Sequence, residues 1–227
     1  MVRKVMSMSK KYKKQFLVLG LGRFGRSVAE TLHSKGYEVM AVDANAERVN
    51  EAVEFTTRAV RADLDEENVL EAIGAGEFDV AVVAIGKSSE TAIMSTMILK
   101  ELGVKNVIVK ANTELQKKAL YKIGADKVVF PERDMGRRVA MSLIHDNVFD
   151  FMEVSEDISI AEIPVLTEWV GKTIIECDVR RKYGVNIIAI KTGEEITVSY
   201  GGDRVFSEED ILIVIGLVDS IDRIGRR

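Results

Sequence analysis

The chain has 227 residues, of which 47% are hydrophobic, a formal net charge of −4 and one cysteine. This length can bury a full core and hold one domain together with a smaller second one. The negative net charge argues against the overall basic character of a nucleic-acid-binding protein. A single cysteine excludes a disulfide framework within the chain. No apolar run approaches the ~18 residues of a membrane span.

The first fourteen residues form a basic segment. Its charged side chains are Arg3, Lys4, Lys10, Lys11, Lys13 and Lys14. The segment has no apolar stretch of the kind found in a secretory signal. We expect residues 1–14 to be a disordered, solvated tail, with contact to an acidic partner or a lipid surface as the alternative.

Short apolar runs alternate with amphipathic helical patterns from residue 16 onward, and glycine follows several of the helical patterns. Strands are predicted at 16–19, 38–42, 58–62, 80–84, 106–110 and 127–130. Helices are predicted at 23–34, 46–54, 66–73, 90–102 and 114–123, with a linking helix at 134–144. The alternation predicts an α/β domain with a six-stranded, doubly wound parallel sheet of order 3-2-1-4-5-6, covered by helices on both faces.

The loop after the first predicted strand reads Gly20-Leu21-Gly22-Arg23-Phe24-Gly25, and a carboxylate, Asp43, follows the second strand. Each residue type has a mechanical role in this position. Gly20 permits a tight turn, Gly22 lets the backbone approach a phosphate, and Gly25 lets the helix pack closely on the strand. The helix N-terminus supplies N–H groups to the phosphate, and Asp43 can accept hydrogen bonds from a ribose. These features together indicate nucleotide binding in a Rossmann-type domain.

Ligands of such sheets bind beyond the carboxyl ends of the strands, at the switch point between the first and fourth strands. The residues expected at this edge are Gly20, Gly22, Arg23, Phe24, Gly25, Asp43, Asp63, Leu64, Ile85, Gly86, Lys110 and Glu132. Asp63 has an alternative role as the cap of a helix that begins near Asp65.

Two charged residues at this edge suggest more specific roles. Arg23 opens a helix, where a cation opposes the macrodipole, so its position is easier to explain if it grips a phosphate. The alternative is a surface arginine that turns to solvent. Glu132 either stabilises the first turn of the linking helix or binds a hard divalent cation beside nucleotide phosphates.

The pattern changes after residue 147, where a smaller α/β or α+β module begins. Its predicted strands are 149–154, 158–165, 185–191, 195–199 and 211–216, and its predicted helices are 173–183 and 219–224. The sequence therefore predicts a nucleotide-binding domain at 15–148 and a second domain at 149–227.

Residues with catalytic chemistry are scarce. The histidines are His33, near the end of the first helix, and His145, in the linking segment away from the sheet edge. Cys177 lies between two acids, which raise a thiol pKa rather than lower it. No His and Cys cluster has metal-ligand spacing. We therefore expect a binding protein and not an enzyme.

Several motifs carry a family resemblance. They are Gly20-Leu21-Gly22-Arg23-Phe24-Gly25, Val42-Asp43, Val83-Ala84-Ile85-Gly86, Lys122-Ile123-Gly124-Ala125-Asp126 and Pro131-Glu132-Arg133-Asp134-Met135-Gly136. In family order over residues 14–224, they resemble the TrkA/KtrA family, in particular its KtrA type. These are cytoplasmic regulatory subunits, built from RCK (or KTN) domains, of bacterial potassium uptake systems.

The resemblance implies ATP or ADP in the Rossmann cleft, with NAD or NADH as a competing ligand. Asp43 would hold the ribose, Arg23 would reach a phosphate within its own subunit or across a dimer interface, and Glu132 would help bind a divalent cation such as Mg²⁺ or Ca²⁺. It also implies dimers assembled into an octameric ring beneath a membrane-embedded potassium-translocating subunit of the KtrB/TrkH type. The protein would be cytoplasmic and peripherally attached to the membrane through that partner.

The resemblance further implies a second ligand, cyclic di-AMP, in the C-terminal domain. Ile174, Ile175, Arg180 and Ile187 fall on the matching positions. Tyr200 stands where such members often carry a proline, which is a departure from the pattern.

Other functional classes remain alternatives. The same glycine fingerprint opens NAD-dependent dehydrogenases, but this chain is too short for their catalytic domain. A nucleotide-responsive repressor would need a helix-turn-helix module and a basic face, which the sequence lacks. A regulator of a different cation channel or antiporter shares the fold and is poorly separated by sequence.

Overall fold

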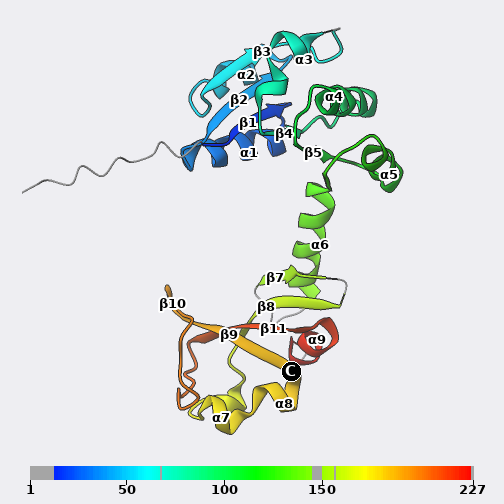
Figure 1. The fold of residues 1–227 in the computed structure, drawn as a ribbon. Helices are drawn as coiled ribbons and strands as arrows, with labels where there is room; N and C mark the ends of the chain where they lie inside the picture. Colours follow the sequence, from blue (N-terminus) through cyan, green and yellow to red (C-terminus); the bar gives the residue numbers. More distant parts are fainter. Residues whose placement is uncertain (1–12, 67, 145–149, 156, 226–227) are drawn as a thin grey trace, which may run out of the picture. The chain divides into compact units, whose positions relative to one another are not determined.

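The computed structural model describes residues 13–66, 68–144, 150–155 and 157–225 (Figure 1). Most of the predicted basic tail, residues 1–12, lies outside the described residues, as does His145. Contacts divide the chain into two compact units, Met1–Pro131 and Glu132–Arg227. We describe each unit by itself.

The first unit contains a six-stranded parallel sheet of order β3-β2-β1-β4-β5-β6, which confirms the predicted doubly wound topology. Its strands are β1 (Gln15–Leu19), β2 (Glu38–Asp43), β3 (Arg58–Arg61), β4 (Val80–Val83), β5 (Asn106–Lys110) and β6 (Lys127–Val129). Leu19, the last residue of β1, pairs with Val42 on one side and Val83 on the other. The glycine turn therefore leaves the sheet at the switch point.

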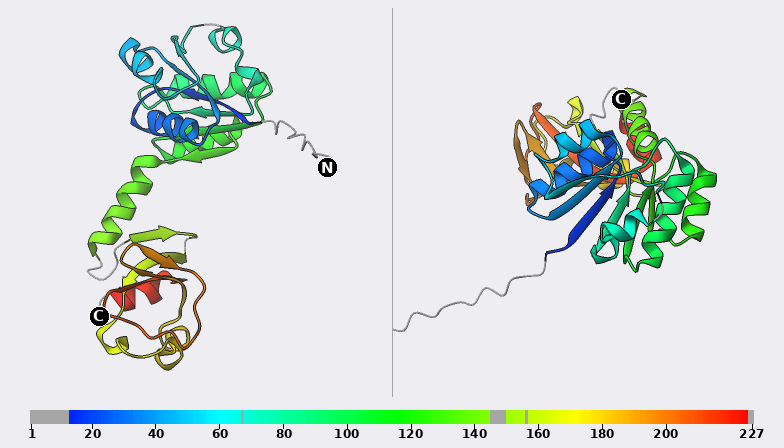
Figure 2. Two further views of the ribbon diagram at one scale, coloured as in Figure 1. Left: turned by 90° about the vertical axis from the view of Figure 1, so that its left-hand side faces the viewer. Right: turned by 90° about the horizontal axis from the view of Figure 1, so that it is seen from above.

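Helices cover both faces of this sheet (Figure 2). They are α1 (Arg23–Ser34), α2 (Ala46–Ala52), α3 (Val69–Ala72), α4 (Ser89–Glu101) and α5 (Glu114–Lys122), with a short 3₁₀ turn, η1, at Ala75–Glu77. Val18 and Ala41 face α1 and α2, whereas Leu17 and Leu19 face α3, α4 and α5. Because the central strands are buried on both faces, they read as continuous apolar runs.

Side-chain caps begin three of these helices where the sequence changes from strand to helix. Asn45, Ser88 and Thr113 accept hydrogen bonds from the backbone N–H three residues later, each at 3.1 Å. A cap of this kind contributes about 1 kcal/mol. The helix predicted at 66–73 is only the four residues of α3, because the residues before it form turns.

The second unit is an antiparallel sheet packed against helices. Its strands are β7 (Asp150–Glu153), β8 (Ile158–Pro164), β9 (Val185–Thr192), β10 (Glu195–Thr197) and β11 (Asp210–Leu217), in the order β10-β9-β11-β8-β7. The unit also holds η2 (Thr167–Trp169), α7 (Ile174–Cys177), α8 (Val179–Tyr183) and α9 (Val218–Gly225). Because every strand pair is antiparallel, this unit has the α+β arrangement of the two that the sequence allowed.

The helix predicted at 173–183 is interrupted. Asp178 adopts the left-handed conformation with φ +48° and ends α7 before α8 begins. The core of the unit lies between the sheet and the helices, with Trp169, Phe206 and Ile221 each almost fully buried.

Helix α6 (Pro131–Ile144) connects the two units and starts three residues earlier than the predicted linking helix at 134–144. The division of the chain falls at the start of α6, whereas the predicted domain boundary lies after its end. The two descriptions differ in the unit with which α6 is grouped.

Candidate functional site

The glycine turn after β1 is shaped by close backbone contacts. Gly20 has φ +92°, and its N–H donates to the Val42 carbonyl at 2.7 Å. A Cβ on Gly25 would lie 1.9 Å from the Gly20 carbonyl oxygen and 2.9 Å from Ala84 Cβ. A side chain at either position would therefore strain or displace the turn.

Gly22 differs from its neighbours, because a Cβ built there meets no atom within 4 Å. Among the residues that the structure describes, none therefore requires glycine at this position on steric grounds. An open approach to the backbone is what a bound phosphate would use.

Asp43 lies at the end of β2 and is only 8% exposed. Its carboxylate accepts hydrogen bonds from the N–H groups of Leu21, at 2.6 Å, and Asn45, at 2.8 Å. Arg48 lies 3.4 Å from the same carboxylate. Asp43 thus fixes the glycine turn to β2, a structural role that the sequence did not reveal. Oδ2 accepts from both Leu21 and Arg48, whereas Oδ1 accepts from Asn45 and still has a lone pair for a hydroxyl, so the ribose contact stays a prediction.

The N-terminus of α1 has the features of an anion site. Gly22 is the N-cap residue and offers no side-chain hydrogen bond, and the first turn contains no acid. The side chain of Arg23 is exposed and makes no hydrogen bond or ion pair with the residues that the structure describes. Free N–H groups, the positive end of the helix dipole and this guanidinium favour a negatively charged ligand.

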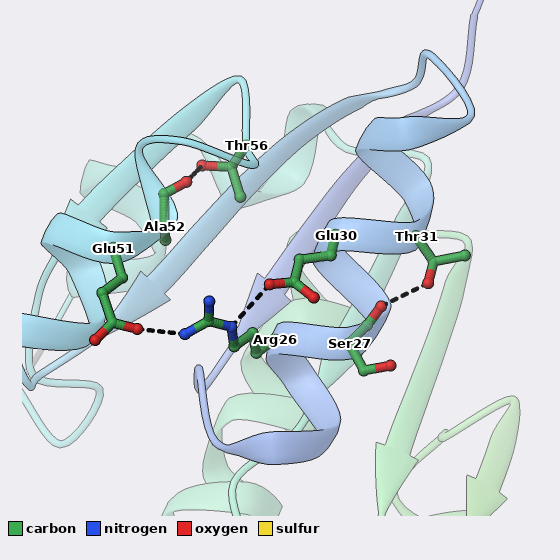
Figure 3. Close-up of polar contacts among 7 residues, drawn as sticks. All are labelled: Arg26, Ser27, Glu30, Thr31, Glu51, Ala52 and Thr56. Carbon is green, nitrogen blue, oxygen red and sulfur yellow. Dashed lines mark hydrogen bonds and ion pairs between the residues drawn. The ribbon is translucent and has the colours of Figure 1, made fainter.

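Arg26, one turn later, has a different environment (Figure 3). Its guanidinium pairs with Glu30 at 2.8 Å and with Glu51 on α2, and it lies 4.9 Å from the centre of the Phe55 ring. Hydrogen bonds to Glu30 and Glu51 raise the pKa of Arg26. Arg26 therefore links α1 to α2 and is held by these partners.

Further edge residues are tied to one another by the loops after β3, β4 and β5. The carboxylate of Asp63 accepts from the Asp65 N–H at 3.1 Å, and the Thr91 hydroxyl donates to Asp65 at 2.5 Å. Since helix α3 begins only at Val69, the proposed cap role of Asp63 is wrong; it forms a turn instead. Thr91 of α4 was not expected at this edge.

The loops after β4 and β5 also meet. The Asn112 side chain donates to the Gly86 carbonyl at 3.1 Å, and a Cβ on Gly86 would lie 3.5 Å from Lys110 Nζ. Leu64 and Ile85 are partly buried against the core. Asn112 is a further residue of this edge that the sequence did not single out. The structure thus brings the predicted edge residues of the first unit to the ends of the strands, as expected.

Glu132 is placed differently. It is exposed in the first turn of α6 together with Asp134, at the start of the second unit. Within the described part of the chain, no group of three or more His, Cys, Asp or Glu residues could hold a metal ion. A cation at Glu132 therefore stays a prediction that needs oxygen atoms from a ligand.

The residues predicted for a second ligand lie around α7, α8 and β9. Ile175 is 72% exposed and Arg180 is exposed, whereas Ile174 and Ile187 are partly buried. Tyr200 donates a hydrogen bond from its hydroxyl to the Ile187 carbonyl. Tyr200 therefore lies beside one of the predicted residues.

Cys177 and His33 show no catalytic environment. Cys177 is 3% exposed, and burial raises the pKa of its thiol, so it is a poor nucleophile. His33 is exposed in the last turn of α1. Among the described residues, no helix has the length and apolar character required to cross a bilayer.

Comparison with known proteins gives a consistent picture. The TrkA-N domain family matches residues 16–131, and the TrkA-C domain family matches residues 158–227. Ktr system potassium uptake protein C of Bacillus subtilis is 46% identical over 95% of this chain and 97% of its own length. Ktr system potassium uptake protein A of the same organism is 41% identical over 92% of this chain and 95% of its own length.

Solved structures share the fold. The GsuK channel bound to NAD superposes with a TM-score of 0.53 at 23% identity, over 94% of this chain and 38% of that chain. The TrkA-N domain of the Escherichia coli inner membrane protein ybaL gives a TM-score of 0.52 at 20% identity, over 59% of this chain and 98% of that chain. With its two domains in this order and its Ktr relatives matched over nearly their full length, the chain belongs to the TrkA family of potassium uptake proteins, in its KtrA-type group.

Proposed function

We propose that this protein is a nucleotide-sensing regulatory subunit that gates a membrane potassium transporter. The names of its Ktr relatives support the transport role. The observation that carries nucleotide sensing is the glycine turn, with open space at Gly22, an uncapped α1 N-terminus and the exposed cation Arg23 beside it. A regulatory role requires no catalytic group, in agreement with the buried Cys177 and the solvent-exposed His33.

In this proposal the ligand is ATP or ADP. Asp43, at the end of β2, would bind the ribose. The N-terminus of α1, beside the glycine turn, would bind the phosphates. Arg23 would grip the terminal phosphate, in its own subunit or across a dimer interface. Glu132 would share a divalent cation with the phosphate oxygens, because hard cations such as Mg²⁺ prefer carboxylate and phosphate oxygen.

Gating follows from differential binding. Dimers in an octameric ring would favour one ring geometry with ATP and another with ADP. A ligand shifts such an equilibrium only by the difference in its affinities for the two states, typically about 1–3 kcal/mol. The ring would attach to a KtrB/TrkH-type subunit at the cytoplasmic face of the membrane.

Two other ligands belong to this proposal. NAD or NADH is the alternative in the first unit, since a channel of the same fold is known with NAD bound. Cyclic di-AMP is the candidate in the second unit, at Ile174, Ile175, Arg180 and Ile187. A regulator of another cation channel or antiporter is the alternative function.

Calorimetric titration of the full chain with ATP, ADP and NADH, with and without Mg²⁺, tests the proposal. We expect ATP to bind more tightly than ADP or NADH, and Mg²⁺ to tighten the binding of ATP. Glu132→Gln should reduce by about tenfold the gain in ATP affinity that Mg²⁺ provides, because a neutral amide is a weaker ligand for the cation. Asp134→Gln, in the same helical turn, is the matched control. Equal losses in both variants would contradict a cation site at Glu132, and tighter binding of NADH than of either adenine nucleotide would favour the alternative ligand.

A further inference from the structure

One loop of the second unit bonds to three of the four residues predicted for the second ligand. It spans residues 198–209, between β10 and β11. The Gly202 carbonyl accepts from the Ile175 N–H at 3.0 Å, and the Arg204 carbonyl accepts from the Ile174 N–H at 3.1 Å. The Tyr200 hydroxyl donates to the Ile187 carbonyl. Ile187 is placed by the pairing of β9 with β11, whereas the loop contributes to the positions of Ile174 and Ile175.

The contact with α7 is close as well as hydrogen-bonded. A Cβ on Gly202 would lie 2.7 Å from Cγ1 and 2.8 Å from Cδ1 of Ile175. The loop backbone thus supports the side chain of Ile175, although 72% of this residue is exposed. A small displacement of the loop would move the apolar surface that Ile175 presents.

A buried ion pair anchors this loop to the sheet. The side chain of Asp210, at the start of β11, is 0% exposed. Arg204 Nη2 lies 3.1 and 3.2 Å from its two oxygens, the Thr192 hydroxyl donates at 2.6 Å, and the Ser207 N–H donates at 2.8 Å. Burying a carboxylate is costly unless it is paired and hydrogen-bonded. Arg204 is thereby held to Asp210.

Arg204 thus has two functions in one residue. Its side chain meets the buried carboxylate, and its backbone carbonyl meets the N-terminus of α7. The same N-terminus of α7 is also capped from within, because Thr173, its N-cap residue, and Glu176 form a reciprocal capping box. The loop is therefore not needed to begin this helix, but it determines the position of the residues at its start.

We infer that Arg204 is a positioning residue for the ligand site of the second unit. It does not touch the ligand; it transmits the fixed position of Asp210 to Ile174 and, through Gly202, to Ile175. The inference rests on the proposed binding of cyclic di-AMP to this unit. The inference predicts that loss of the ion pair between Arg204 and Asp210 weakens the binding of cyclic di-AMP and leaves nucleotide binding in the first unit unchanged.

The test uses the full chain and two ligands, cyclic di-AMP and ATP, titrated against Arg204→Met, Arg204→Lys and two controls. Arg204→Met should weaken cyclic di-AMP binding by about tenfold, within the range of coupling between groups that do not touch, with unchanged ATP affinity. Arg204→Lys should restore part of the affinity. Arg181→Met removes an exposed pair with Asp178, and Ile221→Val loosens the same core; both should keep cyclic di-AMP affinity.

Amide hydrogen exchange gives a readout that needs no ligand. In Arg204→Met, and to a smaller extent in Arg204→Lys, the Ile174 and Ile175 amides should exchange faster. The Cys177 amide, bonded to the Thr173 carbonyl at 3.0 Å, should be unchanged. If the unaltered chain does not bind cyclic di-AMP, the proposed ligand fails while exchange still tests the positioning role. Unchanged exchange at both isoleucines, or equal loss of cyclic di-AMP affinity in Ile221→Val, would overturn the inference.

Discussion

In the first unit the backbone itself forms the candidate binding surface, whereas in the second unit a side-chain ion pair supports the loop beside that surface. Gly20 and Gly25 bring β1, α1 and β4 together at distances that no side chain would permit. In the second unit Asp210 and Arg204 add a charged anchor to a loop that backbone hydrogen bonds also hold to the residues before α7 and at its start. The spacing of the glycines after a strand is a known sequence pattern, whereas no such pattern indicates that Arg204 pairs with Asp210.

The largest expected effect is on the ion pair of the second unit. Asp210→Ala removes the buried carboxylate and leaves Arg204, whose side chain is 38% exposed, to be solvated by water. It should therefore cost about 3 kcal/mol of unfolding free energy, the size of a strong hydrogen bond to a charged group. Trp169 is the only tryptophan and is 2% exposed in the core of this unit, so its fluorescence reports unfolding there. An unchanged midpoint would show that the pair does not stabilise the unit.

Acid sharpens the same test. Burial alone would raise the pKa of Asp210, but hydrogen bonds from Ser207 and Thr192 and the charge of Arg204 lower it below its ordinary 3.8. A carboxylate with a depressed folded-state pKa stabilises the protein above its unfolded pKa and loses that contribution as pH falls through the folded value. The unfolding midpoint that Trp169 fluorescence reports should therefore decrease as the pH is lowered below about 4 in the unaltered chain. In Asp210→Ala this midpoint should depend less on pH.

The next effect concerns the glycine turn. Gly25→Ala forces a Cβ within 1.9 Å of the Gly20 carbonyl oxygen, and should cost about 1–3 kcal/mol in the first unit and abolish nucleotide binding. Gly22→Ala, its matched control, meets no atom. It should keep the stability of the first unit and weaken only nucleotide binding.

These two variants are compared by far-UV circular dichroism for the fold and by calorimetry for ATP. The Trp169 transition of the second unit should not move in either. Equal loss of stability in both would mean that the turn does not depend on the Gly25 contact. Full ATP affinity in Gly22→Ala would show that no phosphate approaches that backbone.

The sequence was informative where function depends on local geometry. The glycine turn, its strand and Asp43 form one short segment with the doubly wound alternation around it, and the structure has the predicted strand order. The same reasoning failed where a distant partner decides the conformation. Asp63 was a plausible helix cap for a helix beginning near Asp65, but Asp65 accepts a hydrogen bond from Thr91 of α4, Asp63 bonds to the Asp65 N–H, and α3 begins later.

The second unit was less predictable for the same reason. An apolar periodicity over 173–183 favours one helix, and nothing in it shows that Asp178 takes a left-handed conformation. Asp210 and Arg204 read as ordinary surface charges in a loop. Their importance appears only when β9 and β11 bring Thr192 next to Asp210.

Arg23 and Arg26 show the same contrast at residue level. They lie three positions apart on α1, yet Arg26 is held by Glu30 and Glu51 while Arg23 is exposed at the uncapped end of the helix. The sequence favours Arg23 by its position at the start of the helix, but only the position of α2 shows that Arg26 has partners of its own. The difference assigns the phosphate contact in our proposal to Arg23.

The central claim is that Arg23 senses the terminal phosphate, and paired titrations of Arg23→Ala with ATP and ADP test it most directly. Arg58→Ala, an exposed arginine at the start of β3, is the matched control at the opposite edge of the sheet. The account predicts that Arg23→Ala weakens ATP binding by about tenfold, the size of one charged hydrogen bond, and weakens ADP binding less. Arg58→Ala should change neither affinity. Equal losses for ATP and ADP, or no loss for either, would contradict it.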